Sequence, residues 1–172
     1  MSKICTKCGL EKSFSEFSQN TPTKKDGYNS WCKQCCYESS RNWVLTPRGI
    51  YSQLKARQTY YKKRWPTRHK PVKISCESFV YWYEDEPKNC IYCDINENDL
   101  NLVVDYLSGH ALRLAIDCKD NDLGYIEGNL ALACDRCNQT KNNLLTYEEM
   151  LYVGKNFIKP KWMKIKEKLE AI

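Results

Sequence analysis

Residues 114–138 read Leu-Ala-Ile-Asp-Cys-Lys-Asp-Asn-Asp-Leu-Gly-Tyr-Ile-Glu-Gly-Asn-Leu-Ala-Leu-Ala-Cys-Asp-Arg-Cys-Asn. This pattern is typical of two short apolar strands, over residues 112–117 and 129–134, joined by a polar loop. A helix is expected to begin at about Asp135, directly after the second strand. The stretch therefore predicts a hairpin that is followed at once by a helix.

Three polar side chains occupy defined places in this predicted unit. Asp117 ends the first strand, Asn129 opens the second, and Asn138 follows a cysteine on the helix. Carboxylate and amide oxygens are the ligands that a hard divalent cation prefers. The alternative for Asp117, a plain strand-end residue, is the weaker interpretation, so we expect a cation site here.

Three C-x-x-C pairs precede this unit, and a fourth lies within it. They form two sets, Cys5, Cys8, Cys32 and Cys35, and Cys90, Cys93, Cys134 and Cys137. Four thiolates at this spacing are typical of tetrahedral zinc, and they leave no open position on the ion. We therefore expect two structural Zn²⁺ ions rather than free buried thiols. Cys36 is an alternative to Cys35, which is preferred because it keeps the two-residue spacing.

Composition limits the class of protein. The chain has 172 residues, a formal charge of +6, 11 cysteines, 7 glycines and 6 prolines, with 28% charged residues. These values are typical of a folded chain. No apolar leader follows Met1 and no apolar run approaches about 18 residues, so we expect metal thiolates in the cytoplasm of a bacterial or phage-infected cell, and no membrane span.

A basic segment lies in the first half of the chain. Residues 55–73 contain eight cations and no acidic residue: Lys55, Arg57, Lys62, Lys63, Arg64, Arg68, Lys70 and Lys73. Such a stripe is typical of a polyphosphate partner, although a solvated helix face is the other interpretation. The aromatic residues among them, Tyr60, Tyr61 and Trp65, either stack on bases or pack against the core.

Caps and prolines predict the remaining helices. Thr46-Pro47 opens a helix over 47–64, and Ser75 caps a second helix that stops before Pro87. Thr146 to Glu149 is a capping box for a third helix, which Pro160 is expected to break before a last helix over 162–171. We divide the chain into a zinc module (1–43), a basic helical segment (44–88), the knuckle-containing unit (89–158) and a C-terminal helix (159–172).

One family shares the order of these motifs. Asp117, Gly124-Tyr125, Asn129 and the run from Cys134 to Asn138-Gln-Thr-Lys141 together resemble the active-site segment of HNH, or ββα-metal, endonucleases with a zinc knuckle. The match covers about residues 90–150, and the layout before it is similar to that of rare-cutting restriction enzymes and phage-borne nucleases in the family. The resemblance implies a small α+β fold, with a ββα-metal core stapled by one zinc site, an N-terminal zinc module and flanking helices.

The resemblance also implies an activity. It is metal-dependent hydrolysis of double-stranded DNA, of restriction or phage/homing type, that leaves 5′-phosphate and 3′-hydroxyl ends. Asp117 and Asn138 would bind one Mg²⁺ or Mn²⁺, Asn129 would brace the loop, and Lys141 would hold a phosphate oxygen. Further phosphate contacts are expected from Arg57, Lys62, Lys63, Arg64 and Arg68. A chain of this size that cuts both strands most simply acts as a twofold dimer.

The general base is the point of departure from the family. Cys118 stands where the commonest pattern has a histidine, and a thiol is a poor base for water. The candidates are His69 and His110, with Tyr92 as a nucleophile or proton donor, and each of them has a structural alternative. Two other functions stay open: a zinc DNA-binding protein on an inactive HNH scaffold, and an RNA-directed nuclease or RNA binder.

Overall fold

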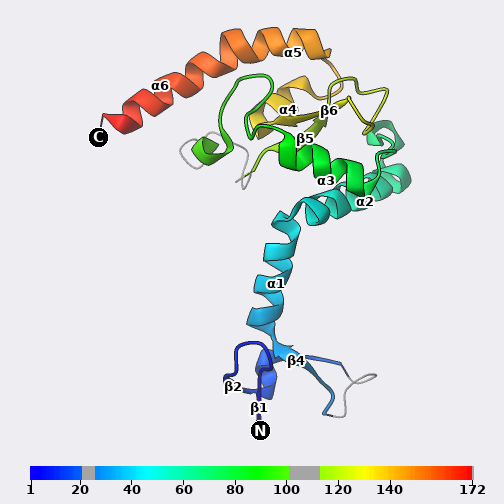
Figure 1. Ribbon diagram of the computed structural model, residues 1–172, viewed down its shortest axis with the longest axis vertical. Coiled ribbons are helices and arrows are strands. Elements are labelled where there is room, and N and C mark those ends of the chain that lie inside the picture. Colours follow the sequence, from blue (N-terminus) through cyan, green and yellow to red (C-terminus); the bar gives the residue numbers. More distant parts are fainter. Residues whose placement is uncertain (21–25, 101–112, 172) are drawn as a thin grey trace. The chain divides into compact units, whose positions relative to one another are not determined.

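A computed structural model of the protein describes residues 1–20, 26–100 and 113–171. It is a small α+β structure that divides into two compact units, Met1–Gln53 and Leu54–Ile172 (Figure 1). Each unit contains one of the expected four-cysteine groups.

The N-terminal unit consists of two small hairpins and a helix. Strand β1 (Ser2–Ile4) pairs antiparallel with β2 (Glu11–Ser13), and β3 (Phe17–Gln19) with β4 (Tyr28–Cys32), with a 3₁₀ turn, η1 (Phe14–Glu16), between the hairpins. Its buried cluster is made of Cys5, Phe17, Cys32 and Cys35, with Tyr28 packed against it. Helix α1 (Lys33–Leu45), which the sequence did not predict, begins inside this cluster.

Helix α2 spans Pro47–Arg64, which are the bounds predicted from the sequence. Thr46 Oγ1 accepts a hydrogen bond from the amide of Gly49 at 3.1 Å, as an N-cap residue does. Ile50 and Leu54 are buried. A 3₁₀ turn, η2 (Pro66–Arg68), follows α2 and leads to the next helix.

The predicted hairpin and helix are present in the C-terminal unit. Strands β5 (Ala115–Cys118) and β6 (Leu130–Ala133) pair antiparallel with Asp117 opposite Ala131, and α4 (Asp135–Lys141) lies against them (Figure 1). Both strands are shorter than predicted, and β5 continues one residue past Asp117 to Cys118. All four residues of β6 are buried, so the hairpin belongs to the core of this unit.

Helix α3 (Cys76–Asp85) begins directly after Ser75, the residue predicted to cap it. The side chain of Ser75 accepts a hydrogen bond from the amide of Ser78 at 3.0 Å. Phe79 and Tyr83 are buried and their rings stack with centroids 6.0 Å apart, so one face of α3 supplies core.

The C-terminal helices differ from the prediction at Pro160. The capping box of Thr146 and Glu149 is confirmed and opens α5 (Tyr147–Val153), but a π-helical segment, η4 (Gly154–Ile158), then leads without a break into α6 (Lys159–Glu170). The expected break at Pro160 is therefore wrong. A proline is tolerated in the first turn of a helix, and here the amide of Lys159 reaches back to the carbonyl of Gly154 in a wide turn just before it. Among the described residues, no helix combines the length and apolar character of a membrane span.

Candidate functional site

The cysteines that the sequence paired lie together in both units. Within each group of four, the ligand atoms are all within 4.8 Å of one another; Sγ atoms are 3.9 Å apart for Cys5 and Cys35, and 3.6 Å apart for Cys93 and Cys134. Zinc–sulfur bonds of about 2.3 Å in a tetrahedron require sulfur atoms about 3.8 Å apart. Both groups could therefore hold zinc. Cys36 is not in its group, and its thiol faces the carbonyl of Trp31.

A polar cleft of about 440 Å³ lies beside β5 and α4. The two side chains expected to bind the divalent cation, Asp117 and Asn138, both border it. Its other charged lining residues are all cations: Arg57, Arg68 and Lys70. Three positive charges and one carboxylate make this cleft attractive to phosphate.

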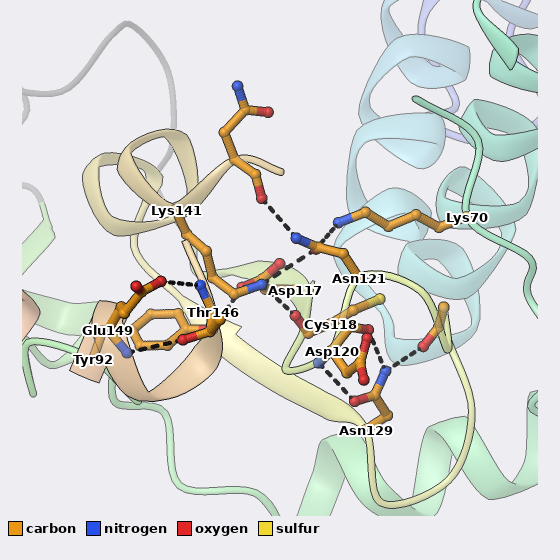
Figure 2. A network of polar contacts seen from close by, with 12 residues as sticks. Lys70, Tyr92, Asp117, Cys118, Asp120, Asn121, Asn129, Lys141, Thr146 and Glu149 are labelled. Atoms are coloured by element: carbon orange, nitrogen blue, oxygen red, sulfur yellow. Dashed lines mark hydrogen bonds and ion pairs between the residues drawn. The ribbon is translucent and has the colours of Figure 1, made fainter. Parts of the chain in front are cut away.

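Asp117 is held in one orientation by two partners. Its Oδ2 atom accepts a hydrogen bond from the hydroxyl of Tyr92 at 2.8 Å and lies 3.5 Å from Nζ of Lys141 (Figure 2). The side chain of Asp117 is only 4% exposed. A buried carboxylate with fixed partners is pre-organised to act as a ligand, because little side-chain freedom is left to lose on binding.

Lys141 does not lie where its spacing from Asn138 predicts. It is on the last turn of α4, but its side chain is fully buried, and Nζ donates to the carbonyl of Cys118 at 2.7 Å and to Oδ1 of Asn121 at 3.2 Å (Figure 2). A phosphate oxygen cannot reach this ammonium group without opening the core. The physical reason is the ion pair with Asp117, which keeps the ammonium group of Lys141 in the protein interior rather than in solvent.

Asn129 braces the loop between the two strands. Its Nδ2 donates to the carbonyls of Asp120 and Gly124 at 2.8 and 2.7 Å, and its Oδ1 accepts from the amide of Asp120 at 2.9 Å (Figure 2). These contacts use both ends of a buried side-chain amide. Asn129 therefore fixes the course of the loop that follows Asp117.

Lys70 is a further candidate site residue that no sequence motif indicates. It follows η2, borders the cleft and donates from Nζ to Oδ1 of Asn121, the same atom that Lys141 contacts (Figure 2). Only its place in the basic segment distinguished it in the sequence. Nothing local in the sequence indicates that residue 70 meets residue 121.

The candidates for the general base are placed unequally. Burial raises the pKa of the Cys118 thiol to about 12, despite the opposing effect of Lys70, so this thiol stays protonated. Burial also raises the pKa of Tyr92, and the neighbouring charge of Asp117 adds to that effect. His69 is partly exposed at the end of η2 and is not among the residues that line the cleft, and His110 lies outside the described residues.

The basic residues expected to meet DNA fall into two groups. Arg57 and Arg68 border the cleft, whereas Lys62, Lys63 and Arg64 are exposed on the last turn of α2. Beside them, the rings of Tyr60, Tyr61 and Trp65 contact one another, with the guanidinium of Arg68 5.6 Å from the Trp65 ring. The aromatic side chains thus pack on each other, with Tyr60 and Trp65 largely exposed and Tyr61 at the cleft.

Comparison with known proteins gives a structural relative. No protein-family model and no curated protein matches the chain. Among solved structures, the chain is similar to the rare-cutting HNH restriction endonuclease PacI, whose structure is described as exhibiting a mechanism of DNA perturbation. The two share 21% sequence identity with a TM-score of 0.54, over 94% of this chain and 96% of that one.

The fold of this chain is similar to that of an HNH restriction endonuclease. The resemblance drawn from the sequence motifs is confirmed at this level. Nearly complete coverage of both chains means that the similarity to PacI includes the N-terminal unit as well as the hairpin and α4.

Proposed function

We propose that this protein is a metal-dependent DNA endonuclease of the HNH type, with β5, β6 and α4 as its ββα-metal core. One observation carries the proposal: Asp117 and Asn138 border the same cleft as Arg57, Arg68 and Lys70. A hard cation and a phosphate are the two ligands that this combination of oxygens and cations suits. The fold similarity to PacI supports this reading.

The donor set fits Mg²⁺ or Mn²⁺. Mg²⁺ binds through one or two protein oxygens and keeps several waters, and Asp117 and Asn138 would supply a carboxylate and an amide oxygen. When bound, the ion would polarise the scissile phosphoryl group and stabilise the leaving 3′ oxygen. Because the surrounding cleft is cationic, we expect the ion to bind more tightly once a phosphate is present.

The remaining residues position these groups. Tyr92 and Lys141 would hold Asp117, and Asn129 would hold the loop beside it. The four-cysteine group of the C-terminal unit includes Cys134 and Cys137, the second of which lies on α4 next to Asn138. Zinc at that group would therefore fix Asn138 relative to the hairpin.

Proton transfer is proposed to involve His69 or His110 as the base. The contact of Tyr92 with Asp117 favours a donor role for this hydroxyl over a nucleophilic one. We further propose sequence-specific cleavage of double-stranded DNA by a homodimer in the cytoplasm, giving 5′-phosphate and 3′-hydroxyl ends. The fold similarity to a rare-cutting restriction enzyme supports the specificity.

The test uses purified, zinc-loaded protein with long phage and plasmid DNA and Mg²⁺ or Mn²⁺, with EDTA as the control. Discrete fragments that disappear with EDTA are expected. Asp117→Ala should abolish cleavage while DNA binding persists, and Asp122→Ala, which removes an exposed carboxylate from the same loop, should cleave normally. Equal cleavage by wild type and Asp117→Ala would refute the proposed site.

A DNA-binding protein without catalysis is the second candidate. The observation that favours it is Cys118, a buried thiol with a raised pKa at the position where the common pattern has a base. Under this alternative, the wild type binds DNA in a salt-sensitive manner but cleaves neither DNA nor RNA with any divalent ion. The same incubation, repeated with duplex RNA, separates a DNA enzyme from an RNA enzyme.

A further inference from the structure

We propose that Lys70 is a catalytic residue of this cleft, and that its ammonium group binds a non-bridging oxygen of the scissile phosphate. The inference rests on the proposed nuclease function and adds a phosphate-binding residue to it. It is carried by the way the backbone and side chain of Lys70 are fixed beside Asp117.

The backbone of Lys70 is anchored on both sides. Its amide donates to Oε1 of Gln58 at 2.8 Å, and Gln58 is a buried residue of α2. On the other side, the carbonyl of Pro71 accepts from the amide of Tyr125 at 2.8 Å, and the carbonyl of Tyr125 accepts from the amides of Lys73 and Ile74. Residues 70–74 are therefore attached to the loop between β5 and β6.

Gly124 makes this attachment possible. Its φ is +71°, and a Cβ there would lie 2.6 Å from the carbonyl oxygen of Pro71. Only glycine allows the two backbones to approach so closely in this conformation. The contacts of Gly124 and Tyr125 with residues 71–74 thus position Lys70 at the edge of the cleft.

The side chain of Lys70 is directed by Asn121. Asn121 Oδ1 accepts from Nζ of Lys70 and from Nζ of Lys141, while its Nδ2 donates to the carbonyl of Asn142 at 3.0 Å (Figure 2). A lysine ammonium carries three hydrogen-bond donors. The one contact described for Lys70 leaves donors that can meet a ligand in the cleft.

Lys70 and Lys141 differ in what they can reach. Lys141 is completely buried, whereas Lys70 is half-buried and borders the cleft. Burial lowers the pKa of Lys70, and the nearby carboxylate of Asp117 opposes this effect, which agrees with an ammonium group close to the carboxylate. A partly desolvated cation acts more strongly on a phosphate than one surrounded by water.

The chemistry assigns Lys70 an electrostatic role. Water adds to phosphorus and one of its protons passes to the base. The bond from phosphorus to the 3′ oxygen breaks, and that oxygen takes a proton from solvent water and leaves as a hydroxyl. Negative charge builds up on the non-bridging oxygens in this step. Lys70 would stabilise that charge and would neither gain nor lose a proton.

The experiment compares Lys70→Gln and Lys70→Arg with the control Lys164→Gln, which removes an exposed lysine of α6 that lies outside the basic segment. The single-turnover cleavage rate is measured at saturating protein, and the affinity for DNA is measured in EDTA. We expect Lys70→Gln to lower the rate by about a hundredfold or more, as loss of one preorganised donor does. We expect affinity to change only a few-fold, Lys70→Arg to keep most of the rate, and Lys164→Gln to keep all of it.

The outcomes separate this inference from the proposed function. If the wild type cleaves DNA and Lys70→Gln cleaves at the same rate, the role of Lys70 is refuted and the nuclease stands. The role is also refuted if Lys70→Arg, with an unchanged melting temperature, is as slow as Lys70→Gln, because charge would then not be what matters. If the wild type cleaves no nucleic acid, the proposed function fails and this role fails with it.

Discussion

Nζ of Lys141 lies 3.5 Å from Oδ2 of Asp117, and neither side chain is more than 4% exposed. This ion pair connects the last turn of α4 with the end of β5, which are the two elements that carry Asn138 and Asp117. Burying two opposite charges costs desolvation energy, so each charge depends on the other. The pair therefore links the stability of the unit to the residue expected to bind the catalytic ion.

Lys141→Met tests this dependence. Removing one partner leaves Asp117 as an unpaired buried charge, so the free energy of unfolding should fall by about 3 kcal/mol. Urea unfolding followed by circular dichroism measures the change. Lys164→Met, which removes an exposed lysine from α6, should stay within about 0.5 kcal/mol of the wild type.

The double variant Asp117→Asn with Lys141→Met provides the second comparison. It removes both charges, so it should be more stable than Lys141→Met alone. A Lys141→Met protein as stable as the wild type would contradict the assigned ion pair.

Tyr92→Phe distinguishes two roles for the tyrosine. As the donor to Asp117, the hydroxyl orients the carboxylate, and its loss should lower cleavage by about 10- to 100-fold. As a covalent nucleophile, its loss would abolish turnover altogether. Single-turnover rates measure the difference, and Tyr152→Phe, at an exposed tyrosine of α5, should cleave like the wild type.

Local signals allowed much of the fold to be predicted. The capping box of Thr146 and Glu149, the cap at Ser75 and the bounds of α2 each depend on residues close together in the sequence. The C-x-x-C spacing predicted both four-cysteine groups for the same reason, because the two cysteines of each pair are close together in the sequence. Helix α1 was overlooked because its sequence is largely polar and only Cys35 is buried, so no apolar periodicity marks it.

Parts of the site depend on contacts that are remote in sequence. The inward orientation of Lys141 is set by Asp117, Cys118 and Asn121, and the position of Lys70 is set by Gln58 and by the same Asn121. From the sequence alone, Lys141 and Lys70 both look like lysines that contact a phosphate. Only tertiary structure distinguishes the lysine that is buried from the one that borders the cleft.

Cysteine substitution tests the zinc site of the N-terminal unit. Cys35→Ser should lower the zinc content from about two ions per chain to about one, because a tetrahedral site loses a thiolate ligand. The unit's buried cluster is mostly cysteine, with Phe17 and Tyr28, so it should also become sensitive to protease. Metal analysis and limited proteolysis measure both effects.

The neighbouring cysteine is the matched control. Cys36→Ser should retain both ions and resist protease, because its thiol lies outside the four-cysteine group. Zinc loss in Cys36→Ser but not in Cys35→Ser would show that the ligands are assigned wrongly.

Two glycines of the same loop offer a sharper comparison. Gly124 and Gly128 both have positive φ, of +71° and +77°, but a Cβ on Gly128 would meet nothing within 4 Å, whereas one on Gly124 would collide with Pro71. Gly128→Ala should therefore lose only the conformational cost, about 1 kcal/mol of unfolding free energy. Gly124→Ala should lose about 1–3 kcal/mol more, because the collision adds an overpacking cost.

Cleavage rates of Gly124→Ala and Gly128→Ala distinguish backbone strain in the loop from displacement of Lys70. Residues 70–74 must move away from the loop in Gly124→Ala, so Lys70 should leave its contact with Asn121, and the single-turnover rate should fall toward that of Lys70→Gln. Gly128→Ala leaves this attachment in place and should cleave at nearly the wild-type rate. Equal rates for the two alanine variants, at temperatures where both are folded, would mean that the attachment of residues 70–74 to Tyr125 does not position Lys70.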